Sequence, residues 1–111
     1  MISLTEKEKK AIDELLIGLK KLYGANLRQV ILYGSKARGE ANEGSDIDIM
    51  VVLKDYEKWD EEHKKVFELV YSIEEKYGYD LLISTVIKKE KEYVGRNTPL
   101  LLNVRKEGIR L

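Results

Sequence analysis

The sequence predicts an α/β fold in which a small mixed sheet packs against helices. Three mostly apolar runs, Leu27–Tyr33, Ile49–Leu53 and Tyr79–Ser84, have the length and composition of strands. Two longer stretches, Ser3–Tyr23 and Asp60–Tyr77, repeat apolar residues at helical spacing. Because the two patterns alternate, we expect the order helix, strand, turn, strand, helix, strand and a last helix.

Length and composition indicate one domain and limit the classes of function. We expect residues 1–111 to form a single domain, because the chain is long enough for one core but not for a second, substrate-holding domain. The absence of cysteine excludes disulfides and thiolate metal sites. Twenty basic and twenty acidic residues cancel, so no overall positive charge attracts nucleic acid. No run resembles a membrane span or a signal peptide, and we expect a cytoplasmic protein.

The first helix is predicted over Ser3–Tyr23. Two overlapping capping boxes, which begin at Ser3 and Thr5, signal its start without fixing the register. Gly24 follows the last turn, where glycine commonly ends a helix. The face expected to cover the core carries six side chains: Ile12, Leu15, Leu16, Leu19, Leu22 and Tyr23.

The first strand, Leu27–Tyr33, ends at a Gly34-Ser35 corner. On its own, a Gly-Ser pair indicates no more than a strand-ending turn. Glycine also allows backbone angles closed to other residues and lets a phosphate approach the main chain. We therefore expect the Ser35 hydroxyl and the amides of the following helical turn to meet a triphosphate, with added positive charge from Lys36 and Arg38.

The second strand is predicted to open with Asp46-Ile47-Asp48 and to continue through Ile49–Leu53. Side chains alternate faces along a strand, so Asp46 and Asp48 project on one side, roughly 6 to 7 Å apart along the backbone. Two carboxylates this close repel each other, and burying them without a counter-charge is unfavourable. A divalent cation between them removes the repulsion, so the pair predicts a metal site.

Three other kinds of site are excluded by particular residues. A P-loop needs lysine and then serine or threonine where this chain has Glu40 and Ala41. An EF-hand needs a glycine turn and a distal glutamate, whereas an apolar run follows Asp48. A glycosidase pair comes from opposite sides of a cleft, whereas Asp46 and Asp48 are neighbours on one edge.

A second helix is predicted over Asp60–Tyr77, ended by Gly78. Its core-facing side chains are expected to be Val66, Phe67, Val70, Ile73 and Tyr77. His63, the single histidine, lies one turn after Trp59, and we expect a half-buried packing residue rather than a catalyst.

The third strand is predicted over Tyr79–Ser84. Asp80 places a charge near its start, and a solvent-facing strand end is the simplest explanation of that charge. Farther along, Thr98-Pro99 has the residue types of a helix cap and first turn, which predicts a last helix over Leu100–Glu107.

The run from Gly34 to Gly39, Gly-Ser-Lys-Ala-Arg-Gly, and the later Ser45-Asp46-Ile47-Asp48 together resemble a known signature. It is that of the nucleotidyltransferase superfamily typified by DNA polymerase beta and kanamycin nucleotidyltransferase. The likeness is greatest to its shortest stand-alone form, the minimal nucleotidyltransferase (MNT) of HEPN/MNT toxin–antitoxin pairs, and covers nearly the whole chain. The resemblance implies the polymerase beta-like nucleotidyltransferase fold.

The resemblance also implies roles for the motif residues. Asp46, Asp48 and Asp80 would form a catalytic carboxylate triad that holds Mg²⁺, expected as two ions, with Asp80 beside the other two on the neighbouring strand. One ion would activate the attacking hydroxyl while the other neutralises the leaving pyrophosphate. Asp80 would also accept the hydroxyl proton. ATP is the expected substrate, bound by Gly34, Ser35, Arg38, Gly39 and Ser45.

The partner implied by the resemblance is a HEPN-type RNase toxin encoded next to this chain. As an antitoxin, the protein would move AMP from ATP onto a hydroxyl of the toxin, typically of tyrosine, and so silence it. No membrane or nucleic acid is required, and any oligomer would form through the complex. A non-catalytic antitoxin that inhibits its partner by occlusion is the alternative, and a subunit that modifies a small molecule held at an interface is a third hypothesis.

Overall fold

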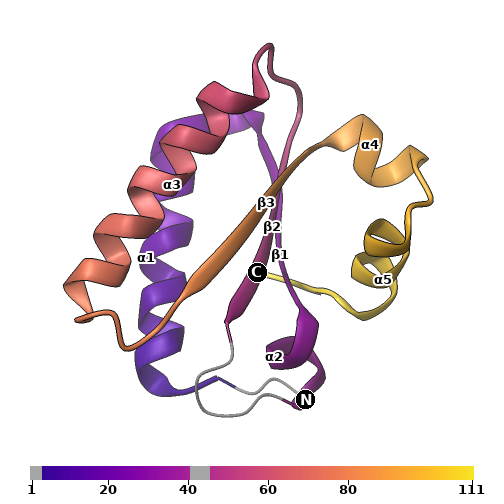
Figure 1. Ribbon diagram of the computed structural model, residues 1–111. Helices are drawn as coiled ribbons and strands as arrows, with labels where there is room; N and C mark the ends of the chain where they lie inside the picture. Colours follow the sequence, from indigo (N-terminus) through magenta and orange to yellow (C-terminus); the bar gives the residue numbers. More distant parts are fainter. Residues whose placement is uncertain (1–3, 41–45) are drawn as a thin grey trace.

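The computed structural model describes residues 4–40 and 46–111, and its centre is a four-stranded mixed sheet (Figure 1). The strand order is β3-β2-β1-β4. β1 is antiparallel to both of its neighbours, whereas β2 and β3 are parallel. The strands are β1 (Leu27–Tyr33), β2 (Ile47–Leu53), β3 (Ile83–Lys89) and β4 (Ile109–Arg110). The predicted mixed sheet is therefore confirmed.

Helices cover both faces of the sheet. Figure 1 shows α1 and α3 side by side on one face and α4 and α5 on the other. A short helix, α2, directly follows β1, and a 3-10 turn, η1, directly precedes β1. None of the helices in the described ranges has the length and hydrophobicity required to cross a membrane. The bounds are α1 (Glu6–Tyr23), η1 (Gly24–Asn26), α2 (Gly34–Arg38), α3 (Trp59–Lys76), α4 (Glu90–Gly95) and α5 (Pro99–Glu107).

Strand β2 divides the core into two clusters. Its odd-numbered residues from Ile47 to Leu53 pack in the cluster that contains α1 and α3 side chains. Met50 and Val52 pack instead with Leu101 and Val104 of α5. Because side chains alternate along a strand, Asp48 projects on the α4 and α5 side of the sheet.

Most ends of helices and strands predicted from local sequence signals lie within one or two residues of the observed ends. The capping box that forms is the second of the two predicted: Thr5 Oγ1 accepts from the Glu8 N–H at 3.1 Å, and Glu8 Oε1 accepts from the Thr5 N–H at 2.9 Å. Thr98 caps α5 as expected, with Pro99 in the first turn. The predictions for Leu22 and Phe67 are wrong, because these side chains are 44% and 56% exposed beside the buried stripes of α1 and α3.

The predicted start of the third strand is also wrong. β3 begins at Ile83, four residues after Tyr79. The reason is a tight turn at the end of α3, where Gly78 and Tyr79 adopt φ of 65° and 61°. The Tyr79 N–H donates to the Glu74 carbonyl at 2.9 Å and so holds the turn closed. Asp80 therefore lies in a bend before the strand.

A buried ion pair joins α1 to α2. Lys36 Nζ lies 2.8 Å from Glu8 Oε2, and the two residues are only 6% and 8% exposed. Burial alone would raise the pKa of Glu8, but the bonds from Lys36 and Thr5 lower it on balance. The pair thus contributes stability above the ordinary glutamate pKa and loses it as the pH falls. Lys36 was expected to add charge for a phosphate, and this expectation is corrected: its ammonium is already bound inside the protein.

Removing one partner of the Lys36–Glu8 ion pair is expected to destabilise the protein. Lys36→Met should lower the free energy of unfolding by about 3 kcal/mol, because it leaves the Glu8 carboxylate buried without its partner. Adding Glu8→Gln should recover part of the loss. The exposed pair of Lys9 with Glu6 offers a control, since Lys9→Met should change stability by less than about 0.5 kcal/mol. Denaturant unfolding measures all three, and equal losses for Lys36→Met and Lys9→Met would contradict the assignment.

Candidate active site

The glycine-serine corner and the second strand meet at Gly34 and Asp48. Tyr33, the last residue of β1, is paired with Asp48 in the antiparallel register. A Cβ atom built on Gly34 would lie 2.3 Å from Asp48 Oδ2, and Gly34 has a φ of 74°. Both the backbone angle and the contact therefore require glycine. The corner is built against the carboxylate of the predicted metal site.

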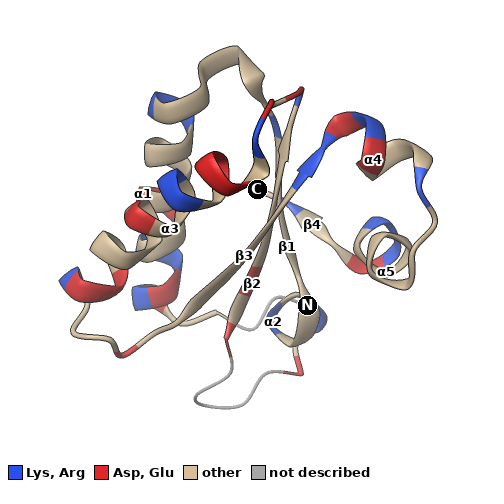
Figure 2. Ribbon diagram, turned by 45° about the horizontal axis from the view of Figure 1, so that its top comes forward, with Lys and Arg blue, Asp and Glu red and all other residues tan. Residues whose placement is uncertain are grey.

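Asp46 and Asp48 form a carboxylate pair at the start of β2, and neither makes an ion pair with another residue that the structure describes. Asp46 is exposed immediately before the strand, and Asp48 is half-buried within it. Burial raises the pKa of Asp48, the nearby Asp46 charge raises it further, and Arg38 partly opposes both effects. Figure 2 shows this acidic end of β2 beside the basic helix α2. A cation between the two carboxylates would remove the unfavourable charge interaction.

Helix α2 places one cation near the pair. Gly39 ends the helix in the left-handed conformation, with a φ of 75°, and its N–H donates to the Ser35 carbonyl. Arg38 Nε lies 3.0 Å from Glu40, just after α2, and Arg38 Nη1 lies 3.4 Å from Glu107 at the end of α5. The Arg38 guanidinium is therefore bound by two carboxylates, both at the surface, and is close enough to influence Asp48.

Asp80 does not join the other two aspartates in this structure. Its side chain is 66% exposed, and its Oδ2 lies 2.9 Å from Lys7 Nζ on α1, the helix that covers the opposite face from Asp48. The β3 residue paired with Asp48 is Ser84. This structure does not place Asp80 beside the pair, because the turn at Tyr79 delays the start of β3.

The donor set fits part of the expected magnesium site. Carboxylate oxygens are the ligands that Mg²⁺ prefers, and Asp46 and Asp48 supply them on one face of β2. Across residues 4–40 and 46–111, no three His, Cys, Asp or Glu side chains gather closely enough to hold a metal ion. Ser45, predicted to bind nucleotide, lies outside the described residues. The pair fits a cation, whereas Asp80 fits only after a rearrangement.

The sequence pattern did not single out Tyr33 as a neighbour of Asp48. This residue is half-buried, and its pKa is raised first by burial and then by the charge of Asp48. The available signal was the hairpin itself: in an antiparallel pair, the residue before the corner lies opposite the start of the next strand. His63 is half-buried and stacks on Trp59 with ring centroids 4.7 Å apart, so its expected packing position is confirmed.

Comparisons with known proteins show the family of this chain. Residues 12–110 match the family model described as the nucleotidyltransferase domain. A Methanocaldococcus jannaschii protein named "Putative protein adenylyltransferase MJ0604" is 34% identical over 102 residues, which cover 91% of this chain and 94% of the relative.

Two solved structures share the fold. One, described as "Structure of putative minimal nucleotidyltransferase", has a TM-score of 0.61 and 26% identity and covers 98% of this chain and 99% of its own. The other is a tri-AMPylated Shewanella oneidensis HEPN toxin in complex with MNT antitoxin. The match has a TM-score of 0.57 and 19% identity, and it covers 92% of this chain and 69% of the matched chain. These likenesses confirm the predicted fold.

Replacing Gly34 should disturb both the backbone and Asp48. Gly34→Ala is expected to lower the free energy of unfolding by about 2 kcal/mol, because the new Cβ is disfavoured at this φ and collides with the carboxylate. Gly78→Ala is the matched control: its φ is 65°, but a Cβ there meets nothing within 4 Å. Denaturant unfolding should show a smaller loss for Gly78→Ala, and equal losses would mean that the Asp48 contact adds nothing.

Charge at Asp48 should make the protein less stable as the pH rises. Because its native pKa is raised, the folded state binds more protons than the unfolded state just above the ordinary aspartate pKa, so stability falls through that window. Asp48→Asn is therefore expected to raise Tm at pH 7 in metal-free buffer, with the gain shrinking toward pH 4. Asp55 has a lowered pKa, so Asp55→Asn should act in the opposite direction. A lower Tm for Asp48→Asn at pH 7 would contradict this sign.

Proposed function

The chain belongs to the nucleotidyltransferase domain family, and from this premise we propose that it moves AMP from ATP onto a hydroxyl of a partner protein and releases pyrophosphate. The family predicted from the Gly-Ser corner and the paired aspartates is thus confirmed. One observation carries the proposal: Gly34 packs directly against Asp48, so the corner that would admit a phosphate and the carboxylates that would hold its cation form one site.

Asp46 and Asp48 are the residues that would hold Mg²⁺. When bound there, Mg²⁺ supplies charge neutralisation for the phosphates and lowers the pKa of an attacking hydroxyl. The protein's own contribution is to fix the two carboxylates. Ile47 and Ile49 are fully buried on the opposite face of β2, and this burial holds the alternating aspartates on the α5 side.

The corner and α2 are proposed to bind the triphosphate. Gly34 leaves the main chain open to a phosphate, and the next residue, Ser35, is half-buried and carries a hydroxyl. Arg38 would exchange its two surface carboxylates for phosphate oxygens, which form comparable charge-assisted hydrogen bonds. Gly39 ends α2 so that Arg38 remains at the open end. Ser45 stays a predicted ligand from sequence alone.

Asp80 is proposed to join the pair through a lengthening of β3. Ser84 and Val86 project on the face of β3 that Asp48 shares on β2, and side-chain alternation would place Asp80 on that face if the strand were extended toward its start. The extension would break the exposed ion pair with Lys7 and release the left-handed backbone of Tyr79. In that position the Asp80 carboxylate would accept the proton of the attacking hydroxyl.

The proposed acceptor is a tyrosine of a HEPN-type toxin encoded in the neighbouring gene, which makes this protein its antitoxin. The M. jannaschii relative's name supports protein as the acceptor class, and the AMPylated toxin held by a similar fold supports the partner. Asp46 and the end of α2 are exposed, so a side chain of a bound partner has access to them. A non-catalytic antitoxin that acts by occlusion is the second candidate. The position of Asp80 on Lys7 favours it, because the carboxylate set is then incomplete.

Transfer of label tests the proposal. With α-³²P-labelled ATP, Mg²⁺ and the purified HEPN protein, the wild type should attach AMP to a tyrosine of that protein, located by mass spectrometry. Asp46→Asn with Asp48→Asn should reduce the rate by at least about 100-fold, since charge stabilisation by the cation is lost. Asp55→Asn, at the far end of β2, should leave the rate unchanged. Tight complex formation without transfer would support occlusion instead.

The same assay tests the proposed movement of Asp80. Lys7→Ala should raise the transfer rate and tighten Mn²⁺ binding, measured by electron paramagnetic resonance, because Asp80 is no longer held on α1. Asp80→Asn should lower both. Lys9→Ala removes a neighbouring exposed ion pair and serves as the control. Unchanged Mn²⁺ affinity in Lys7→Ala and Asp80→Asn would remove Asp80 from the metal site.

A further inference from the structure

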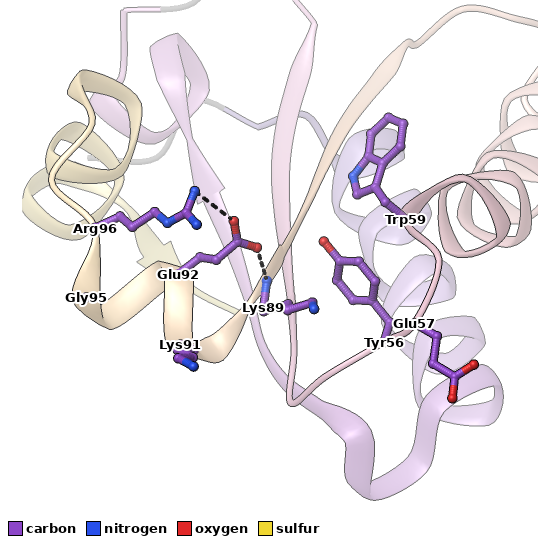
Figure 3. Close-up of a pocket in the computed structure, with 8 residues that line it drawn as sticks. All are labelled: Tyr56, Glu57, Trp59, Lys89, Lys91, Glu92, Gly95 and Arg96. Atoms are coloured by element: carbon purple, nitrogen blue, oxygen red, sulfur yellow. Dashed lines mark hydrogen bonds and ion pairs between the residues drawn. The ribbon is translucent and has the colours of Figure 1, made fainter.

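A pocket lies at the end of the sheet opposite to Asp46 and Asp48. It has a volume of about 640 Å³, in the range of small-molecule sites. One wall comes from the connection between β2 and α3, and the other from the end of β3 and from α4 (Figure 3). This is the carboxyl end of the parallel pair β2 and β3, where open α/β sheets commonly bind ligands. The lining residues are Tyr56, Glu57, Trp59, Lys89, Lys91 and Glu92, with Gly95 and Arg96.

We propose that this pocket is a second nucleotide site that takes a nucleoside monophosphate, with its base against Tyr56 and Trp59 and its phosphate toward Lys91 and Arg96. The site uses neither aspartate, so it does not rest on the function proposed above.

The aromatic wall is held in place by its neighbours. Trp59 is 48% exposed, and its ring stacks on His63 at an interplanar angle of 15°. Tyr56 is half-buried, with Lys89 Nζ 5.0 Å from its ring centroid. Figure 3 shows the two rings on the same side of the pocket. Fixed aromatic faces stack on any base, and each stacked base contributes about 1 to 3 kcal/mol.

The charges suit a ligand with a single phosphate. Glu92 accepts from the Lys89 N–H at 3.1 Å and pairs with Arg96 at 3.5 Å, and Asp55 pairs with Lys89 Nζ at 3.2 Å. Lys91 is exposed and takes part in no ion pair within the described ranges. Lys91 is thus the first cation available to a phosphate. Arg96 is the second, because its 3.5 Å pair with Glu92 leaves the arginine side chain exposed and such surface pairs are weak. A triphosphate would bring more negative charge than these two side chains balance.

Tryptophan fluorescence reads this site directly, because Trp59 is the single tryptophan of the chain. The full chain is titrated without Mg²⁺, so that the unneutralised charges of Asp46 and Asp48 disfavour a phosphate at the proposed catalytic site. AMP should change the Trp59 emission with saturation, adenosine should bind about tenfold more weakly, and inorganic phosphate alone should bind least. In ¹⁵N NMR spectra, the amide of Gly95 should shift in the same titration.

Variants separate this site from general binding of anions. Lys91→Glu should weaken AMP at least tenfold and leave adenosine unchanged, whereas Lys10→Glu on α1 should alter neither. Unchanged Trp59 emission and an unmoved Gly95 amide at millimolar AMP would overturn the proposal. The same conclusion would follow if Lys91→Glu and Lys10→Glu weakened AMP equally.

Discussion

The contact between Gly34 and Asp48 is the constraint on which the rest of the site depends. It requires the antiparallel register that pairs Tyr33 with Asp48, since a slip by one residue would turn the aspartate toward the buried α1 and α3 layer. It also requires a residue without a Cβ, because any side chain on Gly34 would overlap the carboxylate. Sheet register and corner geometry therefore specify one arrangement together.

The buried ion pair between Lys36 and Glu8 anchors the corner of the site to α1. Lys36 directly follows the Gly34-Ser35 corner and pairs with Glu8, which also completes the capping box of α1. The first helix and the proposed phosphate-binding turn are thus linked through a single carboxylate. Among the described residues, the carboxylates of Asp46 and Asp48 have no such ion-pair partner, and burial together with the Asp46 charge raises the pKa of Asp48. This contrast is typical of functional sites, where unfavourable charge is retained for a ligand and stability is supplied elsewhere.

The two ends of the sheet have different chemistry. Acidic side chains and a glycine corner lie where β2 begins, and aromatic and basic side chains surround the pocket where β2 and β3 end. The two ends are joined by β2, whose side chains from Ile49 to Leu53 are buried on both faces, which makes this strand a rigid spacer. A ligand at either end would therefore find its site formed in advance, apart from the segment that holds Asp80.

The sequence by itself determined the features that depend on residues close together in the chain. Helix caps at Thr5 and Thr98, the strand that ends at Gly34 and the paired aspartates were all predictable, because each involves contacts or alternation over a few residues. Only the tertiary structure decided the partners of Lys36 and Asp80. Lys7 and Asp80 are 73 residues apart, and Lys36 meets Glu8 across two helices. Both pairs depend on how the elements pack. The position of Asp80 also depends on the left-handed conformation of Tyr79, which a tyrosine rarely adopts and which the sequence therefore does not predict.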